Sequence, residues 1–353
     1  MQLNAKNVGW LRQAATGVLA FVCGWLFSLI GLPLGWLIGS MLAVAGASLL
    51  KLPIEQPKAV MPYVRASIGT MLGAAITVEL FVSFPEWWTS LVYLMIALLL
   101  SGAINFWLLS KPLKFDKPSA ALCSVPGGIA EMILLSEQAG ADQAKVAIVH
   151  ALRIALCILI LPILIAWVMH VDVQRSSAEF GSIPSLSDIG WFLVCVAAGV
   201  AADRWTKIPA RLVLVPLIVS AVLHMTGVTS FEVPETITNI VQVFIGINVG
   251  GRFLNITLRQ LSMVLVAAVM VVTVQITIAF SAANLVSGLS GLDPVALVLA
   301  YSPGGLAEMS LIAVAMGREV AFVGLHHVFR VLVALALAPL VLSRIGVSNR
   351  EGG

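Results

Sequence analysis

The sequence Pro-Gly-Gly-Ile-Ala-Glu-Met occupies residues 126–132, and Pro-Gly-Gly-Leu-Ala-Glu-Met occupies residues 303–309. The two copies lie 303 − 126 = 177 residues apart, and the same offset continues downstream without a gap. It carries His150 onto His327 and Arg153 onto Arg330. Between residues 126 and 162, 13 of the 37 aligned positions are identical. Similarity of this length at a fixed period predicts an internal duplication.

The composition around this repeat is that of a membrane protein. The chain has 353 residues, of which 60% are hydrophobic and 10% are charged, whereas globular domains carry roughly 25% charged residues. This predicts a polytopic membrane protein and argues against a water-soluble enzyme. The net charge of +3 is too small to indicate a nucleic-acid partner. The four cysteines lie in apolar runs without paired spacing and are interpreted as small buried residues, not disulfides or metal ligands.

Apolar segments divide the chain into two halves. A hydrocarbon core about 30 Å thick takes about 20 apolar residues per helix. On this scale each half contains six segments, at 9–31, 34–50, 59–78, 87–110, 119–138 and 144–170, and at 189–203, 209–228, 236–255, 260–286, 294–315 and 320–344. We therefore predict a first membrane repeat at 1–172, a polar linker at 173–188 and a second membrane repeat at 189–353.

The positive charges predict that the two repeats are inverted. In the first half, Lys and Arg gather at the N-terminus and in the loops after the second and fourth segments, as at Lys51 and Lys111. In the second half they gather after the first and third segments, as at Arg204 and Arg252, and at the C-terminus. By the positive-inside rule, equivalent loops then face opposite sides of a bacterial inner membrane, and both termini are cytoplasmic.

Inversion requires an odd number of crossings in each repeat. Six apolar segments then give five transmembrane helices and one broken or re-entrant segment, so the expected fold is an all-α membrane protein of about 5+5 spans. The fifth segment is the expected broken one, because proline removes a backbone donor and glycine releases the helix. Irregular backbone at membrane depth occurs where protein or a wet cavity surrounds it.

Inverted repeats with broken helices are typical of secondary transporters, whose sites lie near the breaks. A helix restarting after Pro-Gly-Gly presents free N–H groups and the positive end of its dipole, and two such ends facing each other form an anion pocket. Ser302 before Pro303 is interpreted as an N-cap. The predicted substrate-binding residues are Gly127, Gly128, Glu131, Arg153, Ser302, Gly304, Gly305, Glu308 and Arg330. The alternative is that both breaks serve only helix packing or tight turns.

The charged residues of this set leave two interpretations open. Glu131 and Glu308 are candidate proton carriers, or they neutralise Arg153 and Arg330. An arginine in an apolar segment needs a carboxylate, backbone carbonyls or an anionic ligand, because it cannot lose its charge.

The remaining polar residues of the apolar segments also have two interpretations. His150 and His327 are candidates for a proton relay with the two glutamates, or they are hydrogen-bonded packing residues. Asn105 and Gln275 are predicted to make interhelical hydrogen bonds.

The doubled motif, the 177-residue duplication and the starts of the second segments at Leu32-Pro33 and Ile208-Pro209 resemble the bacterial AbrB-type membrane family. That family is distinct from the small DNA-binding regulator of the same name. The resemblance implies a duplicated hydrophobic domain, and members carry labels such as ammonia monooxygenase or regulator of the aidB gene. The inverted plan is also distantly similar to the cation–proton antiporter and anion transporter group, a similarity of architecture that does not fix a substrate.

The sequence favours an inner-membrane secondary transporter of a small anionic metabolite, coupled to protons or sodium. The alternative is a membrane-embedded regulator or sensor without transport. A metal monooxygenase is less favoured, because copper or iron sites use clustered His and carboxylate ligands. Only His326 and His327 are adjacent in sequence, and neighbours on a helix point about 100° apart. We expect no enzyme activity, cofactor, bound metal or nucleic-acid partner, and the oligomeric state stays open.

Overall fold

The computed structural model describes residues 5–30, 34–76, 87–170, 185–205, 211–231 and 233–344. Every regular element within these ranges is a helix. Leu32-Pro33 and Ile208-Pro209, the predicted starts of the second segments, lie outside the described residues, as does most of the predicted linker at 173–188.

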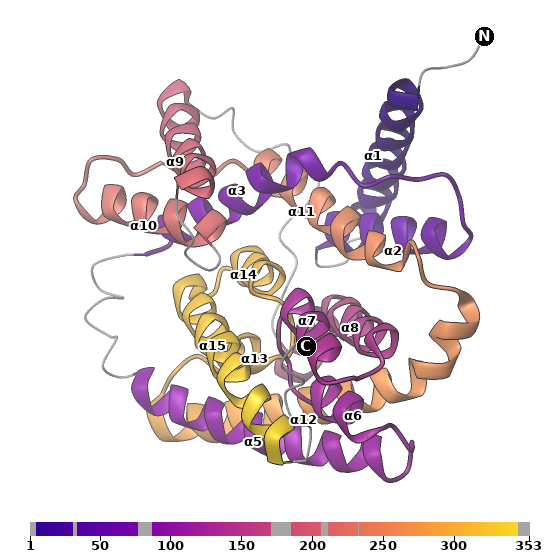
Figure 1. Cartoon of the computed structure of the whole chain (residues 1–353). Helices are drawn as coiled ribbons and strands as arrows, with labels where there is room; N and C mark the ends of the chain where they lie inside the picture. Colours follow the sequence, from indigo (N-terminus) through magenta and orange to yellow (C-terminus); the bar gives the residue numbers. More distant parts are fainter. Residues whose placement is uncertain are drawn as a thin grey trace. The chain divides into compact units, whose positions relative to one another are not determined.

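The predicted apolar segments correspond to helices, and the fifth segment of each half is broken in two (Figure 1). The α-helices are α1 (Ala5–Leu29), α2 (Gly35–Leu49), α3 (Met61–Ala74), α5 (Trp87–Ser110), α6 (Lys117–Ser124), α7 (Ile129–Gln138), α8 (Gln143–Met169), α9 (Leu186–Trp205), α10 (Arg211–Met225), α11 (Glu235–Gly250), α12 (Leu258–Ser290), α13 (Pro294–Tyr301), α14 (Leu306–Ala315) and α15 (Val320–Arg344). The predicted breaks at the two Pro-Gly-Gly sequences are confirmed, between α6 and α7 and between α13 and α14.

The duplication extends to the ends of the broken helices. Adding 177 to the bounds of α6, 117 and 124, gives 294 and 301, the bounds of α13. Adding 177 to those of α7, 129 and 138, gives 306 and 315, the bounds of α14. Both α7 and α14 are followed by a glycine with positive φ, 63° at Gly140 and 61° at Gly317. Glycine adopts this left-handed conformation readily, which ends each helix at the same place.

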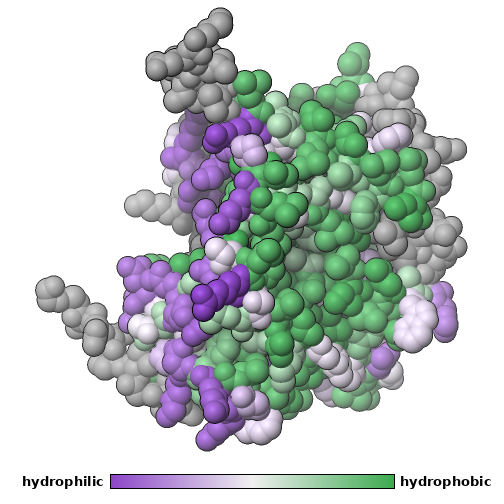
Figure 2. Space-filling view, turned by 90° about the vertical axis from the view of Figure 1, so that its right-hand side faces the viewer, coloured by the Kyte–Doolittle hydropathy of each residue, from purple (hydrophilic) through white to green (hydrophobic). Residues whose placement is uncertain are grey.

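The helices have the length and surface of a membrane protein. Five of the described helices are long and apolar enough to cross a bilayer: α1 from Gly9, α5, α8, α9 and α12. Helix α5 exposes Val92, Ile96 and Leu99 on one face and buries Ser90 and Asn105 on the other. Figure 2 shows broad areas of hydrophobic surface. Because such a surface is stable against hydrocarbon, the chain is an all-α polytopic membrane protein; the count of ten spans stays a prediction.

By contact, the chain forms two compact units, each drawn from both halves. Unit 1 comprises residues 1–84, 162–255 and 310–321, and unit 2 comprises residues 85–161, 256–309 and 322–353. These units differ from the predicted repeats at 1–172 and 189–353, which describe the duplication and stay a prediction. Both Pro-Gly-Gly breaks and every predicted site residue belong to unit 2.

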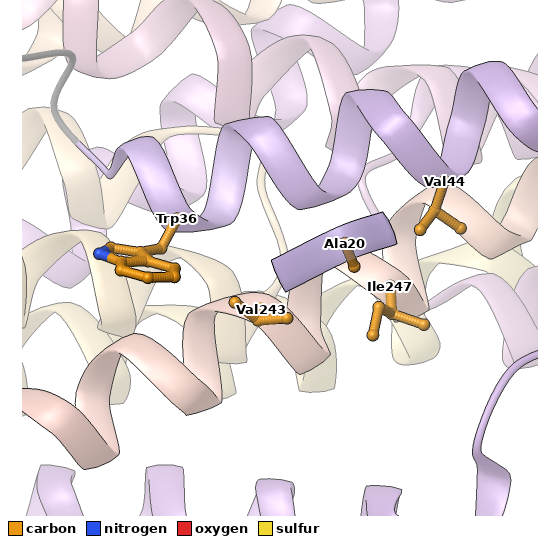
Figure 3. Close-up of a cluster of buried hydrophobic side chains, with 5 residues drawn as sticks. All are labelled: Ala20, Trp36, Val44, Val243 and Ile247. Carbon is orange, nitrogen blue, oxygen red and sulfur yellow. The ribbon is translucent and has the colours of Figure 1, made fainter. Parts of the chain in front are cut away.

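Unit 1 is held together by apolar clusters and close helix crossings. Ala20, Trp36, Val44, Val243 and Ile247 form a buried cluster among α1, α2 and α11 (Figure 3). Glycines let the backbones approach where helices cross. An added Cβ at Gly246 of α11 would overlap the Ser40 hydroxyl and lie 2.8 Å from the carbonyl oxygen of Leu37 in α2. Small residues at such crossings allow the close packing on which membrane helix association depends.

Replacing Gly246 by valine is expected to destabilise the protein by about 1–3 kcal/mol, because the new side chain would collide with the backbone of α2. The measurement is the melting temperature of the detergent-purified protein. Gly46→Ala in α2 is the matched control, since a Cβ there meets no atom within 4 Å. Equal melting temperatures for the Gly246 variant and the wild type would contradict the α2–α11 crossing.

In unit 2 each long helix bonds to the break in the other half of the chain. Helices α5 and α12 contact each other, and α5 also contacts α6 while α12 contacts α13. On α5, the Ser90 Oγ lies 2.9 Å from the Tyr301 hydroxyl, directly before the second break. On α12, Gln275 Nε2 donates to the Ser124 carbonyl, 3.3 Å away at the first break. The predicted interhelical hydrogen bond of Gln275 is confirmed. That of Asn105 is wrong, because its buried amide has no partner among the described residues.

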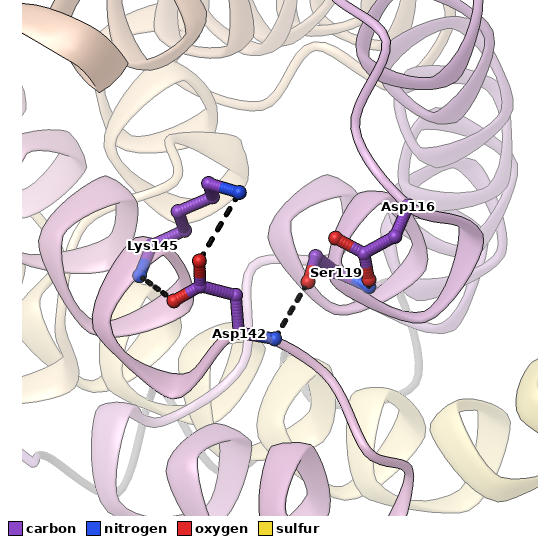
Figure 4. Close-up of polar contacts among 4 residues, drawn as sticks. All are labelled: Asp116, Ser119, Asp142 and Lys145. Carbon is purple, nitrogen blue, oxygen red and sulfur yellow. Dashed lines mark hydrogen bonds and ion pairs between the residues drawn. The ribbon is translucent and has the colours of Figure 1, made fainter.

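A polar cluster joins the starts of α6 and α8 (Figure 4). Asp116 caps α6 by accepting from the Ser119 N–H at 3.0 Å, and the Ser119 hydroxyl accepts from the Asp142 N–H at 2.9 Å. The Asp142 carboxylate then accepts from the Lys145 N–H at 3.1 Å and pairs with the Lys145 ammonium at 3.1 Å. Side-chain caps of this kind satisfy backbone donors at helix starts. They fix the spacing between the first half-helix and the helix that carries Arg153.

The Asp142 ion pair is expected to stabilise the protein above about pH 4 and to contribute progressively less as the pH falls below that value. Burial raises the pKa of the Asp142 carboxyl. The hydrogen bonds and charge of Lys145 together lower it by more than burial raises it, so the pKa lies below its usual value. A depressed carboxyl pKa gives stability above the unfolded pKa that is lost as pH falls. Asp142→Asn should therefore lower the free energy of unfolding at pH 7 by at most about 1 kcal/mol, and the melting temperature with it. A difference from the wild type that persists unchanged at pH 3 would contradict this origin.

Candidate functional site

In the first half of the chain, Arg153 of α8 reaches the first break. Its side chain is 2% exposed. Nη1 donates to His150 Nδ1 at 2.7 Å, and Nη2 donates to the Gly127 carbonyl at 3.0 Å. His150 Nε2 lies 3.0 Å from the carbonyl of Leu122, near the end of α6. Because a guanidinium only donates and a carbonyl only accepts, His150 carries its proton on Nε2, and both of its ring nitrogens are engaged.

In the second half, Arg330 of α15 reaches the second break. It is also 2% exposed, and its two Nη atoms donate to the carbonyls of Ser302 and Gly304. His327 Nε2 lies 3.0 Å from the carbonyl of Leu299 in α13. These partners repeat the first half at the 177-residue offset, with Leu299 replacing Leu122 and Gly304 replacing Gly127. The halves differ in the remaining bond: Arg330 donates to the Ser302 carbonyl where Arg153 donates to His150, and the buried His327 Nδ1 has no partner among the described residues.

The Arg and His side chains therefore stabilise the ends of the half-helices. The last carbonyls of a helix lack intrahelical partners and form the negative end of its dipole. His150 and His327 donate to such carbonyls, Leu122 in α6 and Leu299 in α13, whereas Arg153 and Arg330 donate to carbonyls of the breaks that follow. Of the three kinds of partner expected for the arginines, the hydrogen bonds include backbone carbonyls at both breaks, with a histidine added at the first.

The geometry of the breaks explains both glycines of the motif. An added Cβ at Gly128 would overlap the carboxylate of Glu131, and one at Gly305 would overlap that of Glu308. The second glycine therefore leaves room for the glutamate to fold back over the start of its own helix. The first glycine does the same for methionine, because a Cβ at Gly304 would lie 2.6 Å from Cγ of the fully buried Met309. Gly127 and Met132 repeat this arrangement.

The two glutamates differ in exposure. Glu308 is buried, with 5% of its surface exposed, whereas Glu131 is exposed. Both carboxylates lie over the first turn of α7 or α14, where the positive end of the helix dipole favours negative charge. The charges of Glu308 and Arg153 both act on Arg330. The structure thus brings Glu308, Arg153 and Arg330 within electrostatic range of one another inside unit 2.

One sequence interpretation is wrong. Ser302 is not the N-cap of the helix that follows it; it is the C-cap of α13, and α14 begins only at Leu306. The reason is that Gly304 and Gly305 delay the restart, and the Ser302 hydroxyl bonds back to the Val298 carbonyl at 2.5 Å. The place of Ser302 in a substrate site stays a prediction.

Sequence reasoning also missed a buried polar group beside the second break. Tyr301 donates to the Ser90 carbonyl at 2.8 Å, and the Ser90 Oγ lies 2.9 Å from His326 Nε2. His326 Nδ1 in turn lies 2.8 Å from the Phe322 carbonyl. This chain of bonds ties α5 to α13 and α15. The one signal for it in the sequence is a tyrosine directly before the Ser-Pro-Gly-Gly sequence.

In the ranges that the structure describes, no group of three or more His, Cys, Asp or Glu side chains is placed to hold a metal ion.

Comparison with known proteins shows to which family this chain belongs. Residues 36–346, well over half of the chain, match the family model AbrB, described as transition state regulatory protein AbrB. The protein YhjN of Bacillus subtilis (strain 168) is 24% identical, over 95% of this chain and 91% of that protein. A protein of Escherichia coli (strain K12) named "Putative regulator AbrB" is 25% identical, over 92% of this chain and 93% of that protein. On the strength of the family match, this polytopic membrane protein belongs to the AbrB family.

Proposed function

We propose that this protein is a secondary transporter of the bacterial inner membrane, with both termini in the cytoplasm, that moves a small anion coupled to protons or sodium. The supporting observation is the pair of buried arginines at the two helix breaks of unit 2, whose charges act on each other. An arginine cannot lose its proton, and two buried cations repel. A small anion near them would be stabilised, and charged groups at membrane depth are typical of ion and substrate pathways.

The proposed role of Glu308 is to balance Arg330 when no substrate is bound. Arg330 donates to two carbonyls and forms no ion pair with a described residue. The negative charge of Glu308 acts on it from the start of α14. With this balance Arg330 is not a bare buried cation when the protein changes conformation with the site empty.

The histidines contribute differently. A proton relay through His150 and His327 stays a prediction, and the contacts weigh against it for His150. Protonating Nδ1 of His150 would remove the acceptor of Arg153 and place two positive charges side by side. We therefore assign His150 to holding Arg153 against the first break.

The test is flux in proteoliposomes that contain the purified full-length protein. Radiolabelled acetate, pyruvate, succinate and inorganic phosphate serve as probes, with imposed proton or sodium gradients. The proposal expects uptake of at least one probe, driven by one of the two gradients and absent from protein-free vesicles. Absence of flux for every probe under both gradients would overturn it.

Within this assay, Glu308→Gln is expected to lower net uptake about tenfold, and to lower exchange of internal for external anion much less. Glutamine keeps the shape but loses the charge that balances Arg330, so the empty site must move as a buried cation; tenfold corresponds to about 1.4 kcal/mol. Net uptake and exchange are measured in the same vesicles. The matched control is Glu137→Gln, an exposed residue at the end of α7. Equal losses in both modes would contradict the proposed role.

A second function has its own support. The family description and the name of the Escherichia coli relative both refer to regulation. A membrane-embedded regulator would bind a ligand at the same breaks and change its contact with a partner protein. Binding of a probe anion without flux, together with a stoichiometric protein partner that dissociates when the probe is added, would favour this function over transport.

A further inference from the structure

The two Arg–His pairs have the same spacing on equivalent helices but different hydrogen bonds. At the first break, Arg153 donates to His150 Nδ1 at 2.7 Å. At the second, both Nη atoms of Arg330 donate to carbonyls of the break instead. His327 Nδ1 is therefore left without a partner among the described residues. Both ring nitrogens of His150 are hydrogen-bonded, whereas Nδ1 of His327 is an open hydrogen-bonding position.

The chemical nature of this open position follows from the other ring nitrogen. His327 Nε2 lies 3.0 Å from the Leu299 carbonyl, which can only accept, so Nε2 carries the proton and Nδ1 has a free lone pair. The side chain is 0% exposed. A buried acceptor without a donor costs about 1–3 kcal/mol, and such groups are rare in folded proteins. An acceptor of this kind beside Arg330 indicates that a donor is bound there in another state of the protein.

The groups around His327 limit what that donor can be. On its own helix are Arg330, which is engaged with the break, and His326, whose ring nitrogens face Ser90 and the Phe322 carbonyl. From α13 comes the Leu299 carbonyl, while Arg153 and Cys157 of α8 and Glu308 of α14 act on the neighbouring Arg330. Of these charges, that of Arg330 acts directly on the ring. A proton on Nδ1 would add to this positive charge, and only an anion bound at the same time would offset it.

We propose that His327 Nδ1 takes up the coupling proton together with the transported anion, so that proton and anion bind as a pair beside Arg330. The inference rests on the proposed transport function and names its coupling ion. The proton comes from water on the side of entry and forms an N–H bond at Nδ1. The imidazolium then donates Nε2–H to the Leu299 carbonyl and Nδ1–H to an oxygen of the anion. On the side of exit the anion leaves and the proton returns to water.

This arrangement explains why the two ligands would travel together. Without the anion, a protonated His327 beside Arg330 is an unbalanced buried charge. Without the proton, the anion meets a lone pair in place of a donor. Each ligand therefore strengthens the binding of the other, and this linkage is reciprocal. Glu308 continues to balance Arg330, so for a singly charged anion the loaded and empty sites carry the same net charge.

The experiment counts protons taken up per bound anion by the purified full-length protein. Sodium acetate, sodium pyruvate, sodium succinate and inorganic phosphate are the probes, and calorimetric titrations in two buffers of different ionisation enthalpy give the proton count. The wild type is expected to take up one proton with each anion, and His327→Gln none. Glutamine is chosen because its amide N–H can still donate to the Leu299 carbonyl but cannot be protonated. His170→Gln, at the exposed end of α8, is expected to match the wild type.

Two further variants separate the candidates for the proton site. His150→Leu is expected to keep the proton count while lowering the melting temperature, because Arg153 loses its acceptor. Glu308→Gln is expected to keep the count as well. Loss of the proton in Glu308→Gln and its retention in His327→Gln would overturn the inference and assign coupling to the carboxylate.

The failure of this inference is distinguishable from that of the proposed function. If wild-type protein binds and transports a probe without proton uptake, transport stands and proton coupling through His327 is overturned, whatever the stability of the variant. If no probe is bound or transported, the proposed function fails and this inference fails with it. If the proton count falls from one to none in His327→Gln at an unchanged melting temperature, the inference is supported.

Discussion

Replacing Arg330 by lysine is expected to reduce anion uptake by about a hundredfold, which corresponds to about 2.7 kcal/mol. The guanidinium of Arg330 donates through two separate nitrogens to the carbonyls of Ser302 and Gly304, on either side of Pro303. Lysine has one ammonium nitrogen and lacks this planar fork, so it cannot hold both carbonyls in the same geometry. The charge is retained, but the second break is no longer fixed and a buried carbonyl loses its donor.

The measurement is initial uptake of the probe anions in proteoliposomes with matched protein content. The control is Arg211→Lys in unit 1, because Arg211 is partly exposed and forms an ion pair with Asp203 at 2.6 Å, away from either break. Arg153→Lys is expected to lower both uptake and melting temperature, since it also removes the donor to His150. If Arg330→Lys transports as fast as the wild type, the guanidinium fork is not needed and the proposed site is wrong.

Alanine substitutions at Gly305 and Gly304, the two glycines of the second motif, are expected to have different effects. Gly305→Ala should lower net uptake by about a hundredfold and lower the melting temperature less than Gly304→Ala does. The new Cβ would overlap the end of the Glu308 side chain, which can rotate away. The displaced carboxylate keeps its charge but no longer balances Arg330, so the step in which the empty site changes conformation is slowed.

Gly304→Ala should instead destabilise the protein, by about 1–3 kcal/mol. Its Cβ would lie 2.6 Å from Cγ of Met309, which is fully buried and has no space into which to move. Uptake and melting temperature measured side by side test this separation. Gly102→Ala in α5 is the neutral control, because a Cβ there meets no atom within 4 Å. The interpretation fails if Gly305→Ala transports normally, or if both alanine variants lose stability equally.

The breaks and their repetition were predictable from the sequence because both depend on local signals. Pro-Gly-Gly interrupts a helix wherever it occurs in an apolar segment, and a constant offset of 177 carries helix bounds from one half to the other. The burial of Arg153 and Arg330 also follows from their position in long apolar runs. The misinterpretation of Ser302 has a local cause as well: the cap pattern was present, but the two glycines after Pro303 postponed the helix start.

The hydrogen-bond partners were not predictable, because they depend on contacts between distant helices. Ser90 and Tyr301 are 211 residues apart, and neither belongs to a position that the duplication preserves. The difference between His150 and His327 depends on side-chain conformations of arginines with the same sequence spacing. No pattern in one chain distinguishes an arginine that bonds to its histidine from one that bonds to the break.

Helix α5 bonds to the second break and α12 bonds to the first, and this arrangement also bears on how the protein is synthesised and how it arose. As the chain is synthesised, the first break is inserted into the membrane before α12, which carries the Gln275 amide that binds it, has left the ribosome. The first break therefore lacks its hydrogen bond from Gln275 until the second half has been synthesised. A half-length ancestor would have needed a second copy of itself to supply that helix, and gene fusion would have turned this encounter of two molecules into a contact within one.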